Sequence, residues 1–255
     1  MKANPPVLRA EKLVKRFGGL VALDRVSIEV RPRTITMLIG PNGSGKTTLI
    51  NVISGVYKPE AGRVLFNGME ITGWPPHRVY EAGVVRTFQI PEPFTRLTVL
   101  ENLLVAARGH AGESPIRALF RRCWEKYEEE LVDRAFKVLD ILGLESSWNK
   151  PAYQLSGGQL KLLELGRALM GEPRLLLLDE PVAGVNPKLA YELMEHLVRL
   201  KEELGLSFLI VEHRLDIVLD YVDYAYAMHR GRVIEEGAPD EVLSSKAVAE
   251  AYLGA

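Results

Sequence analysis

The sequence has little cysteine and no long apolar run. Its 255 residues include one cysteine, Cys123, so no disulfide can form within the chain, which fits a reducing compartment. Residues 1–9 show no long apolar stretch after a basic start, so no signal peptide is predicted. The longest apolar runs are short, such as residues 175–178, whereas crossing a bilayer as a helix takes about 20 apolar residues. We therefore expect that the chain spans no membrane and would work at one only by docking on another protein.

Charge of one sign is not in excess either. The net charge is -1 and charged residues make up 25% of the chain, which is typical of an ordinary soluble surface. Without an overall basic surplus, direct binding to nucleic acid is not predicted. The sequence also has no internal repeat and no low-complexity segment, and its length suffices for one large α/β unit or for a core with a subdomain.

The two ends of the chain share one sequence pattern, in which short apolar runs alternate with helical segments. Residues 94–165 differ, because they are helical almost throughout and begin with the capping-box spacing of Thr98 and Glu101. The sequence thus predicts a single α/β domain over the whole chain, with a core of residues 1–93 and 166–255 and an inserted helical part between them. The expected strands cover residues 7–14, 26–30, 35–39, 63–66, 83–88, 174–179, 208–211, 224–228 and 232–236.

A glycine-rich segment follows one of the apolar runs. It fits the pattern G-x-x-x-x-G-K-[ST] and is followed by a helical stretch, which is the context that this motif requires. The glycines allow successive backbone N–H groups to point at phosphate oxygens, and the helix start adds its positive dipole end. We expect Lys46 to reach the β- and γ-phosphates, Thr47 to bind Mg²⁺ and Thr48 to add a phosphate contact. The predicted binding residues of this loop are Gly40, Pro41, Asn42, Gly43, Ser44, Gly45, Lys46, Thr47 and Thr48.

Two acids end the apolar run of residues 175–178. A buried strand of a parallel sheet would carry Asp179 to the carboxyl edge of the sheet, where ligands bind, and there Asp179 can hold the Mg²⁺ shell. Glu180 is the candidate base that orients and polarises an attacking water. Two acids after a strand more often begin a helix, but together with the phosphate loop they indicate catalysis.

A second candidate anion site lies in the helical part. The segment Leu155–Gln159 places a serine and two glycines at the start of a helical stretch, where a hydroxyl and backbone N–H groups can bind an anion. A simple N-cap serine would have the same pattern, but the segment precedes the Asp179 strand by one helix. The predicted binding residues here are Ser156, Gly157, Gly158 and Gln159.

Taken in order, the phosphate loop, the serine–glycine segment and the acidic strand end resemble the ATPase subunits of ABC (ATP-binding cassette) transporters. The resemblance covers nearly the whole chain. It implies a P-loop NTPase core with an antiparallel β subdomain and an inserted α-helical subdomain that carries the signature motif, together with ATP and Mg²⁺ as cofactors and ATP hydrolysis as the activity.

The resemblance also assigns three single residues. Phe17 stands where this family stacks an aromatic ring on adenine. Gln89 resembles the glutamine that senses Mg²⁺ and water, and it is expected to be both catalytic and metal-binding. His213 matches the histidine that contacts the γ-phosphate, and its strand should lie beside the Asp179 strand. With Glu180 and Lys46, Gln89 and His213 complete the expected catalytic set.

The partners are implied by the same resemblance. Such subunits pair head to tail, with ATP held between Lys46 of one chain and Ser156 and Gly158 of the other, as a homodimer or as a heterodimer with a second ABC ATPase. They dock on integral membrane permeases and are peripheral to the cytoplasmic face of the cell membrane. Residues 90–97 and the helical insert are the expected docking surface.

The subfamily follows from shorter stretches. Residues 85–89, 101–106, 183–187 and 251–254 look like the ATPases of branched-chain amino acid importers, which predicts import of these or related hydrophobic amino acids. Asn186 is a departure, because many family members carry Asp there, and the change puts an ionic contact across the dimer in doubt. ATPases of urea or amide importers and of lipopolysaccharide export are similar, and these alternatives stay open.

Two other classes of protein share part of the pattern. A non-transport ABC protein, such as a DNA-repair or translation factor, usually has a long coiled-coil insert or two cassettes on one chain, and the sequence has neither. A P-loop kinase would need an acceptor site, and the serine–glycine segment has no role in its chemistry. The sequence does not reveal the transported solute or the direction of transport.

Overall fold

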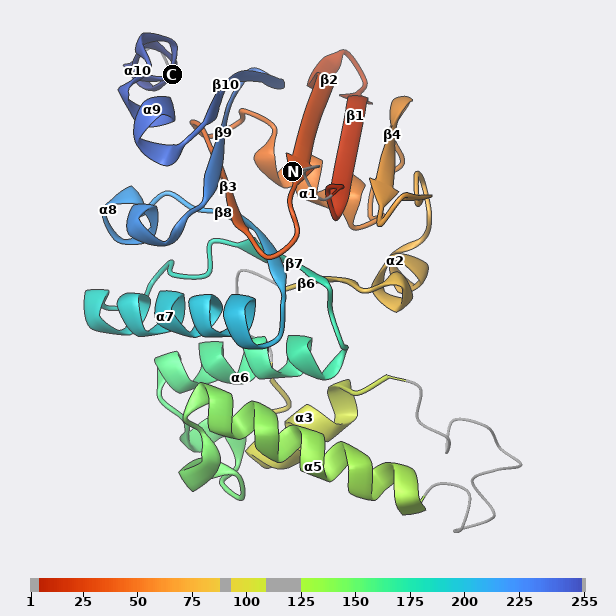
Figure 1. Cartoon of the computed structure of the whole chain (residues 1–255), viewed down its shortest axis with the longest axis vertical. Helices are drawn as coiled ribbons and strands as arrows, with labels where there is room; N and C mark the ends of the chain where they lie inside the picture. Colours follow the sequence, from red (N-terminus) through yellow and green to blue (C-terminus); the bar gives the residue numbers. More distant parts are fainter. Residues whose placement is uncertain (1–4, 88–92, 109–124, 254–255) are drawn as a thin grey trace. The chain divides into compact units, whose positions relative to one another are not determined.

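The computed structural model describes residues 5–87, 93–108 and 125–253. The chain forms two compact units, a strand-rich unit of residues 1–89 and 174–255 and a helical unit of residues 90–173. Figure 1 shows the elements of each. The sequence-based division into an ATP-binding core and a signature-bearing insert stays a prediction.

A six-stranded sheet forms the centre of the strand-rich unit, in the order β10-β9-β3-β8-β7-β6. All neighbouring pairs are parallel except β9 with β10. Every residue of β3, β7 and β8 is buried, which explains their largely apolar sequences, because a parallel strand is covered on both faces. The strands are β3 (Ile35–Ile39), β6 (Val84–Arg86), β7 (Leu175–Asp179), β8 (Ser207–Val211), β9 (Tyr224–His229) and β10 (Arg232–Gly237).

A smaller antiparallel sheet has the order β2-β1-β4-β5. Its second strand begins at Leu20, six residues earlier than the sequence predicted. The register between β1 and β2 shifts at three places, and Lys12 and Arg25 have positive φ there. These bulges interrupt the alternation of apolar and polar residues and so hide the first half of β2. The strands are β1 (Leu8–Phe17), β2 (Leu20–Val30), β4 (Ala61–Phe66) and β5 (Met69–Glu70).

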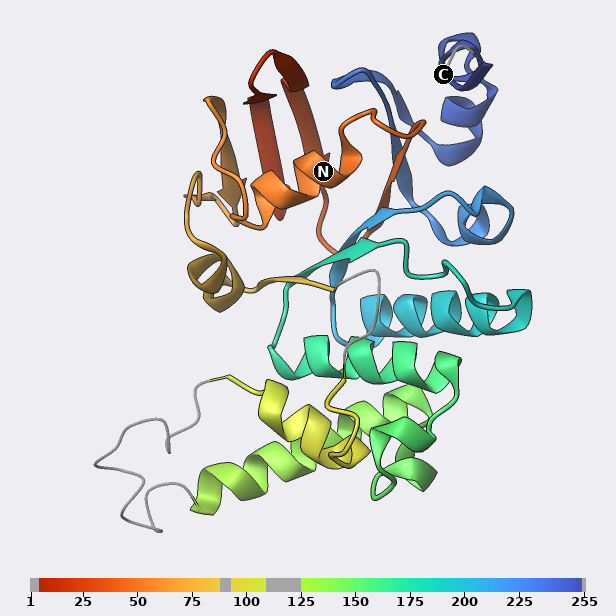
Figure 2. The same cartoon turned by 180° about the vertical axis from the view of Figure 1, so that it is seen from behind.

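Helix α1 (Lys46–Ile53) joins the two sheets into one core. Leu49, Ile50 and Ile53 of this helix are buried in the same cluster as side chains from β1, β2 and β4 and from β3, β7 and β8. Figure 2 shows the helix lying across the antiparallel sheet. The remaining helices of this unit are α2 (Pro76–Ala82), α7 (Pro187–Glu203), α8 (Leu215–Val218), α9 (Pro239–Ser244) and α10 (Lys246–Leu253), with a 3-10 turn η5 (Leu219–Tyr221).

In the described part of the helical unit, helices α3, α5 and α6 pack against one another. The predicted capping box is confirmed: the Thr98 hydroxyl accepts the Glu101 N–H, and the Glu101 carboxylate accepts the Thr98 N–H. Gly166 allows close packing, because a Cβ there would lie 2.9 Å from Leu103 and 3.1 Å from Leu142. The elements are α3 (Val99–Ala106), α5 (Glu125–Leu142), α6 (Gly157–Met170), η3 (Glu145–Ser147) and η4 (Ala152–Gln154). Helix α6 continues through residue 165, at which the sequence analysis ended the helical part.

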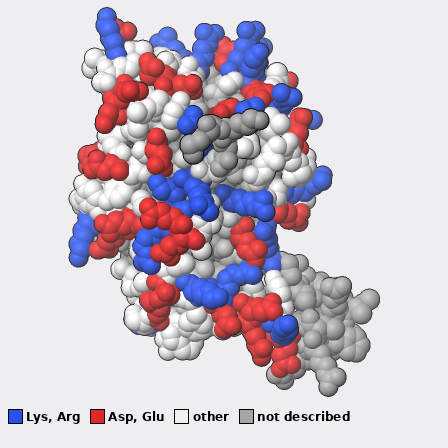
Figure 3. All heavy atoms as spheres, in the orientation of Figure 1, with Lys and Arg blue, Asp and Glu red and all other residues white. Residues whose placement is uncertain are grey.

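The surface agrees with the balanced composition. Basic and acidic side chains are interspersed over the face shown in Figure 3. Within the described ranges, each helix is too short or too polar to cross a bilayer.

Candidate active site

The glycine-rich loop between β3 and α1 is shaped by backbone that only glycine tolerates. Gly40 has φ +145° and a Cβ there would lie 2.1 Å from the carbonyl oxygen of Met228. Gly45 has φ +106° and a Cβ would lie 2.6 Å from the carbonyl oxygen of Ala22. Both glycines are therefore required by the close approach of β9 and β2, as well as by the turn itself.

The lysine of this loop is buried and points back into it. Lys46 Nζ donates hydrogen bonds to the carbonyl oxygens of Gly40 (2.7 Å) and Pro41 (3.0 Å). Burial lowers the pKa of Lys46, while the negative charges of Glu180 and Asp179 act in the opposite direction. A cation is thus held on the inner side of the loop, where it can meet anionic oxygens.

A hollow of about 580 Å³ opens over this loop. Its size lies in the range of small-ligand sites. Phe17, at the end of β1, lines the hollow with 43% of its surface exposed, and its ring meets that of Tyr57 edge-on at 5.2 Å. An exposed aromatic ring beside a phosphate loop suits a base of a nucleotide. The other lining residues are Leu20, Val21, Ala22, Asn42, Gly43, Ser44, Gly45, Lys46, Thr47, Thr48, Glu180, Val211, His213 and Arg230.

The predicted acid and histidine meet at the carboxyl edge of the parallel sheet. Strand β7 pairs with β8 so that Asp179 lies opposite Val211, as the sequence predicted for these two strands. His213 Nε2 consequently lies 3.5 Å from Glu180 Oε1, and both residues line the hollow. Glu180 has φ +53°, a strained conformation for a residue other than glycine. Strain of this kind is concentrated at functional sites.

Three residues that the sequence reasoning did not single out contact this site. Arg86 Nη2 lies 3.2 Å from Asp179 Oδ2, so the acid is held by an ion pair. Tyr252 of α10 accepts a 2.8 Å hydrogen bond from the Gly40 N–H. Glu212 is 1% exposed and directly precedes His213. Glu212 could have been noticed as an acid in an apolar run, whereas nothing in the sequence near Tyr252 indicates a contact with Gly40.

The remaining candidates are Gln89 and the serine–glycine segment. Gln89 is outside the described residues. Ser156 caps α6 in the helical unit: its hydroxyl accepts the Gln159 N–H at 3.3 Å, and the Gln159 side chain accepts the Ser156 N–H at 3.0 Å. A Cβ added at Gly157 would meet no atom within 4 Å, so the backbone there is open to a ligand. The role of this segment in binding stays a prediction.

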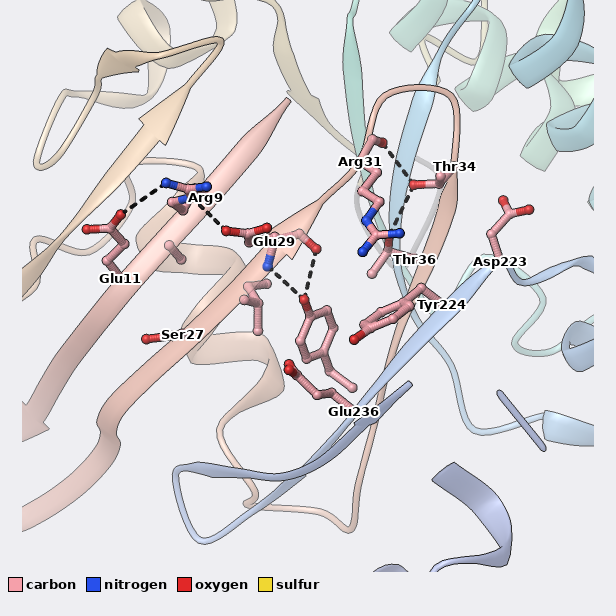
Figure 4. A pocket seen from close by; sticks show the side chains of 13 residues that line it. Arg9, Glu11, Ser27, Glu29, Arg31, Thr34, Thr36, Asp223, Tyr224 and Glu236 are labelled. Atoms are coloured by element: carbon pink, nitrogen blue, oxygen red, sulfur yellow. Dashed lines mark hydrogen bonds and ion pairs between the residues drawn. The ribbon is translucent and has the colours of Figure 1, made fainter. Parts of the chain in front are cut away.

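A second hollow of about 630 Å³ lies between β1, β2 and β9 in the strand-rich unit (Figure 4). Three of its six charged side chains are paired with each other, since Arg9 lies 2.7 Å from Glu29 and 3.7 Å from Glu11. The buried Tyr226 hydroxyl accepts the Glu29 N–H at 2.9 Å and donates to the Glu29 carbonyl at 3.2 Å. These contacts close the seam between the two sheets.

A glycine-rich loop follows the buried parallel strand β3 and precedes a helix, and acids end β7, two positions along the same sheet. This arrangement defines a P-loop nucleotide-binding protein. The family model described as "ABC transporter" matches residues 23–183. The chain therefore belongs to the ABC transporter family and carries its ATP-binding cassette, which binds nucleotide and hydrolyses ATP. A second model, described as "Branched-chain amino acid ATP-binding cassette transporter", matches residues 232–255.

Individual relatives agree with this assignment. The chain is 52% identical to the probable branched-chain amino acid transport ATP-binding protein LivG of Archaeoglobus fulgidus, over 98% of this chain and 96% of that protein. A crystal structure of the ADP conformation of an ATP-binding cassette of an ABC transporter has a TM-score of 0.86 and 48% identity, covering 99% of this chain and all of that one. A dimeric post-hydrolysis cassette bound to ADP and Pi has a TM-score of 0.72 and 25% identity, covering 91% and 98%. The predicted fold class is thus confirmed.

Proposed function

We propose that the chain powers the import of branched-chain or related hydrophobic amino acids across the cytoplasmic membrane. The observation that carries this proposal is the match of residues 232–255 to the branched-chain amino acid cassette model, together with 52% identity to LivG over nearly the whole chain. In this function the chain works at the cytoplasmic face, bound to integral membrane permease subunits.

Nucleotide binding is assigned to the hollow over the glycine-rich loop. The loop N–H groups and Lys46 hold the phosphates, and Phe17 stacks on the adenine. The donor set fits Mg²⁺ as well, because a hydroxyl (Thr47) and a carboxylate (Asp179) are hard oxygen ligands of the kind that Mg²⁺ prefers beside phosphates. Gln89 is the third proposed metal contact. When bound, Mg²⁺ would neutralise charge on the phosphate oxygens.

Hydrolysis is assigned to residues at the ends of β7 and β8. Glu180 orients and polarises the attacking water, and His213, whose Nε2 is 3.5 Å from the Glu180 carboxylate, contacts the γ-phosphate. Lys46 supplies positive charge to the phosphate oxygens in the transition state. The strained backbone at Glu180 supports this assignment, since such strain persists only where the surrounding structure enforces it.

A complete site requires a second cassette. The open N-terminus of α6 can supply the hydroxyl of Ser156 and backbone N–H groups near Gly158 to a nucleotide on the partner subunit. A dimeric cassette bound to ADP and Pi is among the similar structures, which supports such pairing. The pairing would stabilise the transition state only when both subunits close, which couples hydrolysis to movement of the permeases.

Docking is assigned to the segment that starts the helical unit. Phe94 is 50% exposed, and the Arg167 guanidinium lies 5.4 Å from its ring. The fully buried Asn102 accepts the Phe94 N–H at 2.8 Å and donates to the carbonyl oxygens of Phe94 and Thr98. An exposed aromatic residue on such a fixed loop is suited to insert into a partner surface. The expected docking residues 90–92 lie outside the described ranges.

The docking assignment is tested with Phe94→Asp. ATPase activity is measured for the purified cassette alone and in the complex with its permease. We expect the activity of the isolated chain to stay within about twofold, while stimulation by the permease is lost. Leu204→Asp introduces the same charge at an equally exposed apolar position of the strand-rich unit and is the control. Unchanged coupling in Phe94→Asp rejects the assignment.

The transported solute is tested by uptake. Cells that lack this gene, and the same cells carrying wild-type or Glu180→Gln protein, are given radiolabelled leucine or urea, and their surface lipopolysaccharide is measured. We expect leucine uptake to depend on the wild-type protein alone. Dependence of urea uptake or of lipopolysaccharide instead would replace the amino-acid proposal with that alternative.

A further inference from the structure

A buried acid lies beside the catalytic histidine. Glu212, the residue after β8, is 1% exposed. A carboxylate withdrawn from water to this extent is very costly unless strong hydrogen bonds replace the water. The hydrogen bonds that this side chain makes therefore decide its role.

Both carboxylate oxygens of Glu212 accept backbone N–H groups. Val182 lies in the loop after β7, and its N–H donates to Oε1 at 2.7 Å. Oε2 accepts the N–H of His213 at 2.9 Å and that of Arg214 at 3.3 Å, in the loop after β8. The Glu212 side chain thus forms hydrogen bonds with both loops that carry the proposed catalytic residues.

The loop after β7 has a strained conformation that hydrogen bonds hold in place. Its first residue, Glu180, has φ +53°, a conformation that is unfavourable for a residue with a Cβ. Two backbone bonds help to hold it, from the Glu180 N–H to the Val211 carbonyl (2.8 Å) and from the Ala183 N–H to the Glu180 carbonyl (3.1 Å). The bond from Val182 to Glu212 connects this turn to the loop that carries His213.

We propose that Glu212 is a positioning residue for ATP hydrolysis. By fixing both loops, it keeps the carboxylate of Glu180 and the imidazole of His213 in the relative placement in which their atoms lie 3.5 Å apart. Misplacement of a reacting group by about 1 Å is enough to slow a reaction about 100-fold. The inference rests on the proposed roles of Glu180 and His213, and it adds a residue that acts through them.

The test is Glu212→Gln, which keeps the size of the side chain and one acceptor oxygen. The amide nitrogen cannot accept a hydrogen bond, so one of the two loops loses its tie. We expect kcat for ATP to fall about 10- to 100-fold, while KM for ATP and the dissociation constant for ADP change less than about twofold, because the phosphate loop is untouched.

Two controls separate positioning from stability. Glu192→Gln makes the same chemical change at an exposed position of α7 and should leave kcat unchanged. Tyr226→Phe removes a buried hydrogen bond in the hollow between β1, β2 and β9, so it should lower the unfolding midpoint without lowering kcat. Glu212→Asp is the second variant: its shorter carboxylate can still accept the N–H groups of the histidine loop but no longer reaches Val182.

The outcomes are distinct. A lower kcat at constant KM in a folded, ADP-binding Glu212→Gln or Glu212→Asp protein supports the inference. Unchanged kcat in a folded variant overturns it, as does a kcat loss of equal size in Tyr226→Phe. If Glu212→Gln does not fold, Glu212→Asp alone decides by the same criterion. If the wild-type protein, Glu180→Gln and His213→Ala all have equal activity, the proposed function fails and not merely this addition to it.

Discussion

Two hollows of the strand-rich unit have similar volumes, about 580 and 630 Å³, but the backbone and charges that line them differ. Over the glycine-rich loop, Gly40 and Gly45 adopt positive φ, the backbone is strained at Glu180, and Lys46 is buried against carbonyl oxygens. In the hollow of Figure 4, Arg9 is paired with Glu29, and the Tyr226 hydroxyl is satisfied by the backbone. Volume alone therefore does not distinguish a ligand-binding site from a hollow where two sheets meet. A strained residue and a buried cation mark the first hollow, and pairing among half of the charged side chains marks the second.

The largest expected effect is that of Glu180→Gln. Loss of the general base should lower the rate of ATP hydrolysis by at least about 100-fold while ATP binding persists, so the variant accumulates as an ATP-bound dimer. Phosphate release measures the rate, and gel filtration with ATP measures the dimer. Glu236→Gln changes a carboxylate of the other hollow and should leave the rate unchanged. A variant that stays monomeric with ATP, or that hydrolyses at the full rate, contradicts the role of Glu180.

The next effect is that of Lys46→Ala. It removes the cation that is buried against the loop carbonyls, so both nucleotide affinity and turnover should fall, each by about 10-fold or more. Titration with a fluorescent ATP analogue measures the affinity. Lys201→Ala is the control, since Lys201 is also largely buried but pairs with Asp223 at the other hollow. Wild-type hydrolysis by Lys46→Ala would remove this lysine from the site.

Local sequence patterns predicted the strands and helices around these hollows better than the contacts between residues that are far apart in the sequence. The strands of residues 35–39 and 175–179 and the helix that begins at Lys46 follow from apolar runs and a fixed motif, so they were predictable. The first half of β2 was not, because bulges break its alternation. The contact between Tyr252 and Gly40 spans 212 positions of the sequence, and only the folded chain brings them together.

That contact gives an intermediate effect. Tyr252→Phe keeps the ring of α10 but removes the acceptor for the Gly40 N–H, so the loop should be held less firmly and nucleotide affinity should fall about 3- to 10-fold. The same titration measures it. Tyr224→Phe is the matched control, because the Tyr224 hydroxyl makes no hydrogen bond to the described residues. Equal affinities for Tyr252→Phe and wild type would show that α10 does not support the loop.

The smallest effect on activity is expected for Tyr226→Phe. It removes a hydrogen bond between the two sheets and leaves the nucleotide hollow untouched, so the rate of hydrolysis should stay within about twofold. The free energy of unfolding at pH 8 should fall by about 1–2 kcal/mol, because the Glu29 N–H loses its acceptor. Urea titration measures the stability. A large loss of hydrolysis in a stable variant would contradict the distinction between the two hollows.

The pH dependence sharpens this last prediction. Burial raises the pKa of Tyr226 to about 12, above its ordinary value of 10. The tyrosine of the unfolded chain therefore ionises first, so the stabilisation is fully present below pH 10 and is lost as the pH rises toward 12. Phenylalanine cannot ionise, so the stability difference between wild type and Tyr226→Phe should narrow by about 1.4 kcal/mol between pH 8 and pH 11. A difference that stays constant over this range would mean that the phenol is not withdrawn from water, and the seam would then be as open as the nucleotide hollow.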